Sequence, residues 1–171
     1  MNESTPTLPA LKSLGKLASA RPVIVIDTRE QAPLQFTRLE SVTGTLTSGD
    51  YSVHGLEHLF AVERKSVEDL VGCCMGDNRE RFEREMHRLR GFRFARLLIV
   101  GTREEIAAGG YRSRVEPRVV LNSLSAWEAR YNIPAIFADT PSAAATHIER
   151  WAWWFAREIV QQANDLRRGT A

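Results

Sequence analysis

Four short apolar runs constrain the fold of this 171-residue chain more than any other feature. Runs of this length predict buried strands. The later runs alternate with segments of helical spacing, which indicates a sheet with helices on its faces. A looser alternating segment, residues 42–53, predicts one or two further strands interrupted at Gly49–Asp50. The four runs are PVIVID (22–27), HLFAVERK (58–65), RLLIVG (96–101) and AIFAD (135–139).

Helix-start signals follow the second run, residues 58–65. Ser66 followed by Asp69 has the spacing of a capping box and predicts a helix that ends near Met75. Asp77 or Asn78 is expected to cap a second helix, in which one face is apolar and arginines cover the others. The apolar face of this second helix consists of Phe82, Met86 and Leu89.

Helices are also expected in the second half of the chain. Thr102 with Glu105 is another capping box, for a short helix that Gly109–Gly110 ends. Residues 117–131 carry apolar side chains at helical spacing, and Thr140–Pro141 begins a long final helix. The predicted order of elements is β-β-β-α-α-β-α-α-β-α.

The composition is that of a single globular domain, with 43% hydrophobic and 26% charged residues. No apolar run approaches the length needed to cross a bilayer, which excludes a membrane-spanning protein. We expect residues 1–20 to be a flexible lead-in and residues 21–171 to form the domain. The two cysteines, Cys73 and Cys74, are adjacent and build no disulfide framework, which indicates an intracellular protein, cytoplasmic or nucleoid-associated.

Positive charge is concentrated in one segment. The net charge is only +2, but residues 79–96 hold seven arginines against three glutamates. Such a patch can neutralise phosphates. It can equally be a solvated helix face with internal ion pairs, and the charge pattern alone leaves both readings open.

The lysine content singles out one residue. The chain has 20 arginines but three lysines, and Lys12 and Lys16 both lie in the N-terminal segment. Lys65 is therefore the one lysine in the expected folded body. An ammonium is a compact charge with a tunable pKa, so it can orient an attacking water or stabilise a phosphoryl transition state in ways that guanidinium cannot.

Four carboxylates lie near predicted strand ends. Alternation along a strand places Glu63 and Lys65 on one side and Arg64 on the other. If the strands are neighbours, the carboxylates converge, and their repulsion requires neutralisation by a cation or by protons. A few oxygen ligands suit Mg²⁺ or Mn²⁺, which can activate water and stabilise charge on phosphoryl oxygens. The four carboxylates are Asp27, Glu30, Asp50 and Glu63.

Each of these residues also has a structural interpretation. The stretch after Asp27 can be a capped turn, Gly49–Asp50–Tyr51 is a common turn sequence, and the capping box explains Asp69. The joint arrangement, and no single residue, favours the catalytic interpretation.

That joint arrangement resembles a known signature. Gly49–Asp50, then Glu63–Arg64–Lys65 and, after three residues, Asp69 resemble the signature of the XPF-type structure-specific endonucleases. Ile26–Glu30 resembles the upstream element of that family. The downstream helix, the arginine-bearing second helix and the apolar strand are also similar, so the resemblance is strong over residues 23–100.

The resemblance implies the restriction-endonuclease-like fold, an α/β architecture with a mixed central sheet flanked by helices. It implies a DNA endonuclease that uses Mg²⁺ or Mn²⁺ to cut one strand at flaps, forks or junctions during repair or recombination. Arg64 and Lys65 belong to the implied catalytic set, and Asp69 supports the helix that follows. The implied metal-site residues, which complete the catalytic set, are Asp27, Glu30, Asp50 and Glu63.

Five arginines are expected to contact DNA. Arg29 resembles an arginine next to the site, and Arg79 or Arg81 resembles an arginine of the second helix that faces DNA. Arg84 and Arg88 belong to the charged patch, and their loss is expected to weaken DNA binding.

The chain departs from many family members because we expect no helix-hairpin-helix module after the nuclease domain. Recognition of a branch would then come from the arginine patch, from a second subunit in a homodimer, or from another protein partner. Two alternative functions stay open: a catalytically silent DNA-binding subunit, and an interaction module of a recombination complex. An enzyme acting on RNA is a further alternative.

The final helix is rich in tryptophan. Helical spacing places Trp151, Trp154 and Phe155 on one face, which we expect to be core. Trp153 points elsewhere, and it is expected to lie in the core or be buried in part, to mark a dimer interface, or to stack on an unpaired base.

Overall fold

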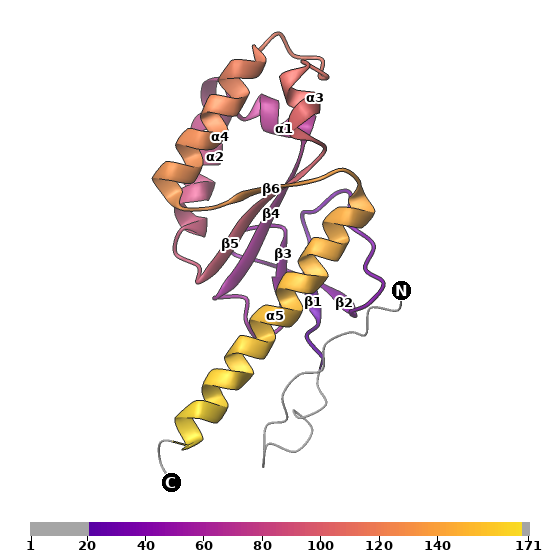
Figure 1. Cartoon of the computed structure of the whole chain (residues 1–171), viewed down its shortest axis with the longest axis vertical. Coiled ribbons are helices and arrows are strands. Elements are labelled where there is room, and N and C mark those ends of the chain that lie inside the picture. Colours follow the sequence, from indigo (N-terminus) through magenta and orange to yellow (C-terminus); the bar gives the residue numbers. More distant parts are fainter. Residues whose placement is uncertain (1–20, 169–171) are drawn as a thin grey trace.

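Within residues 21–168, the part of the chain that the computed structural model describes, six strands and five helices form one body around a sheet (Figure 1). The predicted α/β class with a mixed central sheet is confirmed. Of the described helices, none has the length and apolarity to cross a membrane. The elements are β1 (Ile24–Asp27), β2 (Ser41–Gly44), β3 (Tyr51–Val53), β4 (Phe60–Ser66), α1 (Val67–Gly72), α2 (Gly76–Leu89), β5 (Phe94–Val100), α3 (Arg103–Ala107), α4 (Pro117–Tyr131), β6 (Ala135–Ala138) and α5 (Pro141–Arg168).

The strands run in the order β2-β1-β3-β4-β5-β6. β3 is antiparallel to both of its neighbours, whereas β2 is parallel to β1, and β4, β5 and β6 are mutually parallel. Tyr51 of β3 lies opposite Ile26 of β1 and Val62 of β4. This register brings three predicted site residues into the next row of the sheet. They are Asp27, Asp50 and Glu63.

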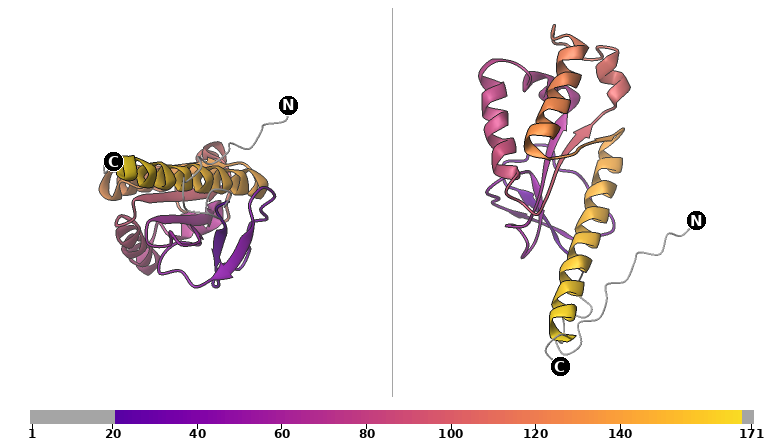
Figure 2. Two further views of the ribbon diagram at one scale, coloured as in Figure 1. Left: turned by 90° about the horizontal axis from the view of Figure 1, so that it is seen from below. Right: turned by 60° about the vertical axis from the view of Figure 1, so that its left-hand side comes forward.

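Two hydrophobic cores lie on opposite faces of the sheet. Ala61 belongs to the core that α1, α2 and α4 complete, whereas its neighbour Val62 belongs to the core under α5. This division follows from the alternation of side chains along β4. Figure 2 shows α5 as a layer of its own, with its C-terminal half extending beyond the strands.

The predicted order of elements is wrong by one strand before α1. Residues 42–53 are predicted to hold one or two strands interrupted at Gly49–Asp50, and the predicted order counts only one. The structure has two there, β2 and β3, which lie on either side of β1. β2 is an edge strand whose side chains are mostly exposed, so no apolar run marks it in the sequence.

The predicted boundary between the first two helices is also wrong. α1 ends at Gly72 instead of near Met75, and Met75, not Asp77 or Asn78, is the N-cap of α2. Gly76 has a φ of +54°, a conformation that costs glycine little. The chain therefore completes its turn before the two polar residues can act as caps.

The core environment predicted for Trp154 is wrong, whereas the burial that was one expectation for Trp153 is confirmed. Trp153 belongs to the core, with 6% of its surface exposed, whereas Trp154 is 47% exposed. Phe155 is buried in the core between α5 and the sheet, as expected, and Trp151 is partly buried at the margin of that core. The helix crosses the sheet at a rotation that turns Trp154 outward, and spacing along one helix cannot specify that rotation.

Candidate active site

The site begins where β3 approaches β4. Gly49 has a φ of +76°, and a Cβ at this position would lie 3.1 Å from the carbonyl oxygen of Val62. Glycine permits both the left-handed conformation and this close approach. The N–H of Asp50 then donates to the carbonyl of Val62 at 2.8 Å. The turn thus holds the carboxylate of Asp50 beside Glu63, the next residue of β4.

Asp50 and Glu63 form an electrostatically strained pair. Burial raises the pKa of Asp50 to about 6, although the hydrogen bond from the N–H of Arg64 (2.8 Å) and the charge of Lys65 oppose this. Burial and the charge of Asp50 raise the pKa of Glu63 to about 8. Each carboxylate therefore resists ionisation while the other is charged.

Lys65 lies against this pair. Its Nζ donates to Oε1 of Glu63, and the ammonium lies 5.6 Å from the centre of the Phe82 ring. Burial alone would lower the pKa of Lys65, but the charge and hydrogen bond of Glu63 raise it above the ordinary value. The predicted alternation is confirmed, because Glu63 and Lys65 are in contact while Arg64 pairs on the other side of the strand.

Arg64 and Glu30 form a bidentate pair on the α5 side of the sheet. Nε of Arg64 donates to Oε2 of Glu30 at 2.9 Å, and Nη2 donates to Oε1 at 2.8 Å. The hydroxyl of Tyr51 also donates to Glu30, at 3.3 Å. Burial would raise the pKa of Glu30, but Arg64 and the N–H of Ala32 hold it below the ordinary value. Glu30 is thus held as a carboxylate by its own arginine.

Asp27 is similarly occupied by Arg29. Its Oδ1 accepts from the N–H of Arg29 at 2.8 Å and from Nε at 2.6 Å, and its Oδ2 accepts from the N–H of Leu46 at 2.7 Å. Burial opposes these bonds, yet the pKa of Asp27 is lowered. The side chain of Arg29 is two-thirds exposed. Asp27 therefore holds an exposed cation beside the row of the sheet that contains Asp27, Asp50 and Glu63.

α1 begins directly after its N-cap Ser66, as predicted, and Asp69 is the third residue of the helix. Oγ of Ser66 accepts from the N–H of Asp69 at 3.1 Å, and the same hydroxyl donates to the Asp69 carboxylate at 2.6 Å. This arrangement fixes the direction in which α1 leaves β4 directly after Lys65.

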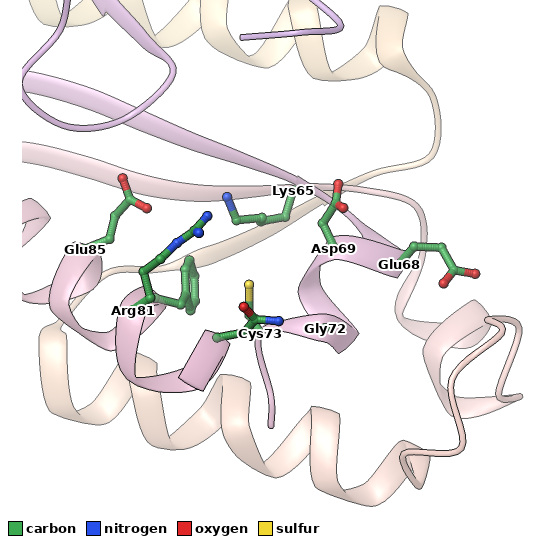
Figure 3. Close-up of a pocket in the computed structure, with 9 residues that line it drawn as sticks. Lys65, Glu68, Asp69, Gly72, Cys73, Arg81 and Glu85 are labelled. Atoms are coloured by element: carbon green, nitrogen blue, oxygen red, sulfur yellow. The ribbon is translucent and has the colours of Figure 1, made fainter. Parts of the chain in front are cut away.

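A cleft of about 290 Å³ opens beside Lys65, between α1 and α2. Figure 3 shows Arg81 and Glu85 of α2 on one side of the cleft and Lys65 on the other. Asp69 and Cys73 of the α1 region line it further along. The cleft therefore gives access from solvent to the lysine of the site.

The predicted DNA-binding arginines of α2 point in different directions. Arg79 turns toward α4, where Nη1 donates to Oγ of Ser123 at 2.8 Å and Nε lies 2.9 Å from a carboxylate oxygen of Glu83. Its guanidinium also lies 5.2 Å from the centre of the Trp127 ring. Arg79 therefore joins two helices and is not directed into the cleft.

Arg81 is the arginine of α2 that lines the cleft. Within the described residues no ion pair to Arg81 occurs. Arg84 and Arg88 are exposed, and each lies only within 3.9 to 4.0 Å of a glutamate of the same helix. Pairs of this kind contribute little to stability. Both guanidinium groups are accessible, because both side chains are exposed.

Glu85 is a site residue that sequence reasoning missed. It lies in the cleft with Arg81 and Lys65 (Figure 3), and its charge contributes to the raised pKa values of both Asp50 and Glu63. Its position four residues after Arg81, on the same side of α2, is the sequence signal that could have found it.

The donor set fits a hard divalent cation. Among residues 21–168, no three Asp, Glu, His or Cys side chains are grouped closely enough to hold a metal ion by themselves. Asp50 and Glu63 nevertheless supply two adjacent carboxylates whose mutual repulsion a cation would relieve. Mg²⁺ is commonly bound by one or two carboxylates together with water and substrate phosphates, so two suffice.

Comparison with known proteins identifies the family. The model of the family described as "ERCC4 domain" matches residues 26–150. A search of the curated proteins found no match.

Two solved structures are similar in fold. XPF from Aeropyrum pernix has a TM-score of 0.60 at 20% identity, over 77% of this chain and 60% of that one. XPF from Aeropyrum pernix in complex with DNA has a TM-score of 0.62 at 19% identity, over 81% of this chain and 66% of that one. The present chain thus spans less than two thirds of either structure. With a family model that covers well over half of its length, the chain belongs to the ERCC4 domain family.

Proposed function

We propose that this chain is a divalent-metal-dependent endonuclease that hydrolyses DNA phosphodiester bonds near branched, flap or fork structures in repair or recombination. The observation that carries the proposal is the pair of partly buried Asp50 and buried Glu63, with Lys65 in contact with Glu63. Two carboxylates that repel each other beside a lysine are costly for stability and suit phosphoryl chemistry. Membership of the ERCC4 domain family supports the same function.

Asp50 and Glu63 are the residues that would hold Mg²⁺ or Mn²⁺. When bound, such an ion lowers the pKa of water and neutralises charge on phosphoryl oxygens. A metal role for Asp27 and Glu30 stays a prediction, since both carboxylates are engaged by arginines in this structure.

Lys65 contributes a proton-bearing ammonium beside the reacting phosphate. Its raised pKa keeps it charged at neutral pH, so it can donate hydrogen bonds to a phosphate oxygen or to the attacking water. Arg64 acts from the far side of the strand. Its N–H fixes the carboxylate of Asp50, and its guanidinium holds Glu30.

Arg29 and Arg81 are the arginines that we assign to DNA phosphates near the cleft, and Arg84 and Arg88, which line another hollow beside α2, are assigned to phosphates further out. The similarity in fold to an XPF that was solved in complex with DNA supports a DNA substrate. Arg79 is a weaker candidate, because Ser123 and Glu83 engage its guanidinium.

A cleavage assay tests the proposal. Labelled flap, fork and blunt duplex DNA are incubated with Mg²⁺ or Mn²⁺ and with the wild-type protein, Asp50→Asn or Lys65→Ala. Glu80→Gln is the matched control, since this exposed glutamate of α2 makes only a loose pair with Arg84. We expect cleavage of branched DNA by the wild type and the control only. Cleavage that survives both site substitutions would overturn the assignment, and intact binding with no cleavage by the wild type would favour a catalytically silent subunit.

A further inference from the structure

The outer face of α5 is not covered by any other described helix or strand (Figures 1 and 2). The inner side of this helix packs on the sheet through residues such as Ile148, Ala152 and Trp153. Side chains that recur at three- and four-residue intervals share the opposite side. We call them the outer face of α5. Its members are His147, Arg150, Trp151, Trp154 and Arg157.

Aromatic rings and cations alternate on this outer face. The rings of His147 and Trp151 lie 5.2 Å apart, and the guanidinium of Arg157 lies 5.0 Å from the centre of the Trp154 ring. Trp151 in turn lies 5.9 Å from Phe94, over which Arg96 stacks at 4.1 Å. The aromatic surface thus continues from α5 onto β5.

The outer face is predominantly cationic. Within the described part of the chain, neither Arg157 nor Arg96 forms an ion pair with a carboxylate. Glu149 lies on the same helix but is buried, and one of its oxygens accepts from the N–H groups of residues 37–39. Glu158 is the acidic residue next to this face, so the positive charge exceeds the negative charge.

We propose that the outer face of α5 binds an unpaired nucleic-acid strand, with a base stacked on Trp154 and phosphates paired with Arg157 and Arg96. Flat rings recognise the faces of unstacked bases irrespective of sequence, and arginines follow the phosphate chain. A paired duplex offers phosphates but no base face, so the aromatic residues specify a single strand. This inference rests on the proposed function and adds a site for the single-stranded arm of its substrate.

A second copy of this chain fits the same face less well. In a two-fold contact the face would meet itself, which would place the arginines of both copies in one interface. Like charges disfavour such a contact, whereas phosphates complement them.

The position of the face sets how long the unpaired arm must be. β4, β5 and β6 are parallel, so α5 begins at the same end of the sheet at which β4 presents Lys65. Trp154 follows Pro141 by 13 residues, which corresponds to about 20 Å along the helix at about 1.5 Å per residue. The cleft lies on the α1–α2 side of the sheet and α5 covers the other side, so a strand that runs from the cleft to Trp154 also passes around the sheet and spans several nucleotides.

The test measures binding of fluorescein-labelled oligo(dT) and of blunt duplex DNA in EDTA, by fluorescence anisotropy. We expect Trp154→Ala to weaken binding of oligo(dT) by about 5- to 100-fold, as for the loss of one stacked base, and Trp154→Phe to retain most of it. Arg157→Gln should reduce the slope of log K against log salt by about 0.7 for the single strand. Leu166→Ala, at another exposed apolar residue of α5, is the matched control and should leave binding unchanged.

Binding in EDTA does not depend on cleavage, so failure of the proposed nuclease function and failure of this inference are separate results. Because Trp154 is half exposed, Trp154→Ala should fold normally, which circular dichroism and size-exclusion chromatography check. Unchanged affinity of Trp154→Ala and Arg157→Gln for oligo(dT) would overturn the inference. A change in oligomeric state without a change in oligo(dT) binding would also overturn it, by identifying the face as a contact between proteins.

Discussion

Asp50, the residue directly before β3, lies next to Glu63 of the antiparallel strand β4. Glu63 is buried and Asp50 is partly buried, and the pKa of each is raised by burial and by nearby carboxylates. A pair of this kind lowers stability, and one proton or one cation between the two carboxylates relieves the repulsion. Asp50 and Glu63 are distant in the sequence, and the register of β3 against β4 brings them together. Gly49 allows its backbone to approach β4 closely.

Asp50→Asn should stabilise the metal-free protein and strongly reduce DNA cleavage by the protein with its metal ion. The amide keeps the shape of the side chain but removes the charge that opposes ionisation of Glu63. We expect a higher Tm at about pH 8 in EDTA, loss of the increase in Tm that Mn²⁺ gives the wild type, and a fall in cleavage of about 10²- to 10³-fold. Thermal denaturation with and without Mn²⁺ measures the first two. A Tm below that of the wild type would show that the carboxylate of Asp50 is stabilising.

The metal-free protein should lose stability as the pH rises. The unfolded chain releases the proton of Glu63 near the ordinary pKa of 4.5, whereas the folded protein retains it until about pH 8. The folded state therefore binds more protons across this window, and the free energy of unfolding falls as the pH increases through it. Asp27 and Glu30 have lowered pKa values and act in the opposite direction, but only in the acid range.

Chemical denaturation in EDTA at about pH 5.5 and about pH 8.5 checks this dependence. Saturating Mn²⁺ should weaken or reverse it, because the cation favours the ionised carboxylates. A free energy of unfolding that rises between these two pH values in EDTA would contradict the raised pKa of Glu63.

The sequence predicted the parts of the fold and of the site that depend on local pattern. Alternation along residues 60–66 placed Glu63 with Lys65 and turned Arg64 away, as observed. The capping box of Thr102 with Glu105 is present in full. These features involve neighbours in sequence, whose geometry is set by strand or helix periodicity alone.

Features that depend on packing between distant elements could not be predicted. The pairing of Glu30 with Arg64 joins residues 34 positions apart, and no periodicity relates them. The rotation of α5, which buries Trp153 and exposes Trp154, is set by its contact with the sheet. Glu85 lies near the acidic pair only because α2 packs beside β4. In the sequence it is one of three glutamates among the seven arginines of residues 79–96, and nothing there relates it to Asp50 or Glu63.

Removing one partner of the Glu30–Arg64 pair should strongly destabilise the protein. Both side chains are largely buried, so Arg64→Met leaves Glu30 without its cation. The expected loss is about 3–5 kcal/mol in free energy of unfolding, measured by urea denaturation near pH 7. Arg118→Met is the matched control, since its pair with Glu116 is exposed and should contribute less than about 1 kcal/mol.

The double variant Glu30→Gln with Arg64→Met separates the two contributions to this loss. It removes the buried charge along with its partner, so we expect it to recover a substantial part of the stability lost in Arg64→Met. A double variant no more stable than Arg64→Met would show that packing of the arginine side chain, and not the unpaired carboxylate, accounts for the loss.

Arg81→Gln and Arg79→Gln should affect different properties, because the two side chains point in different directions. Arg81 lines the cleft and has no ion pair among the described residues, so its loss should reduce the slope of log K against log salt for duplex DNA by about 0.9 without a change in Tm. Arg79 donates to Ser123 and pairs with Glu83, so its loss should lower Tm and leave the salt slope unchanged. DNA binding at several salt concentrations and thermal denaturation measure both. A salt slope that falls for Arg79→Gln and not for Arg81→Gln would reverse the assignment of these two arginines.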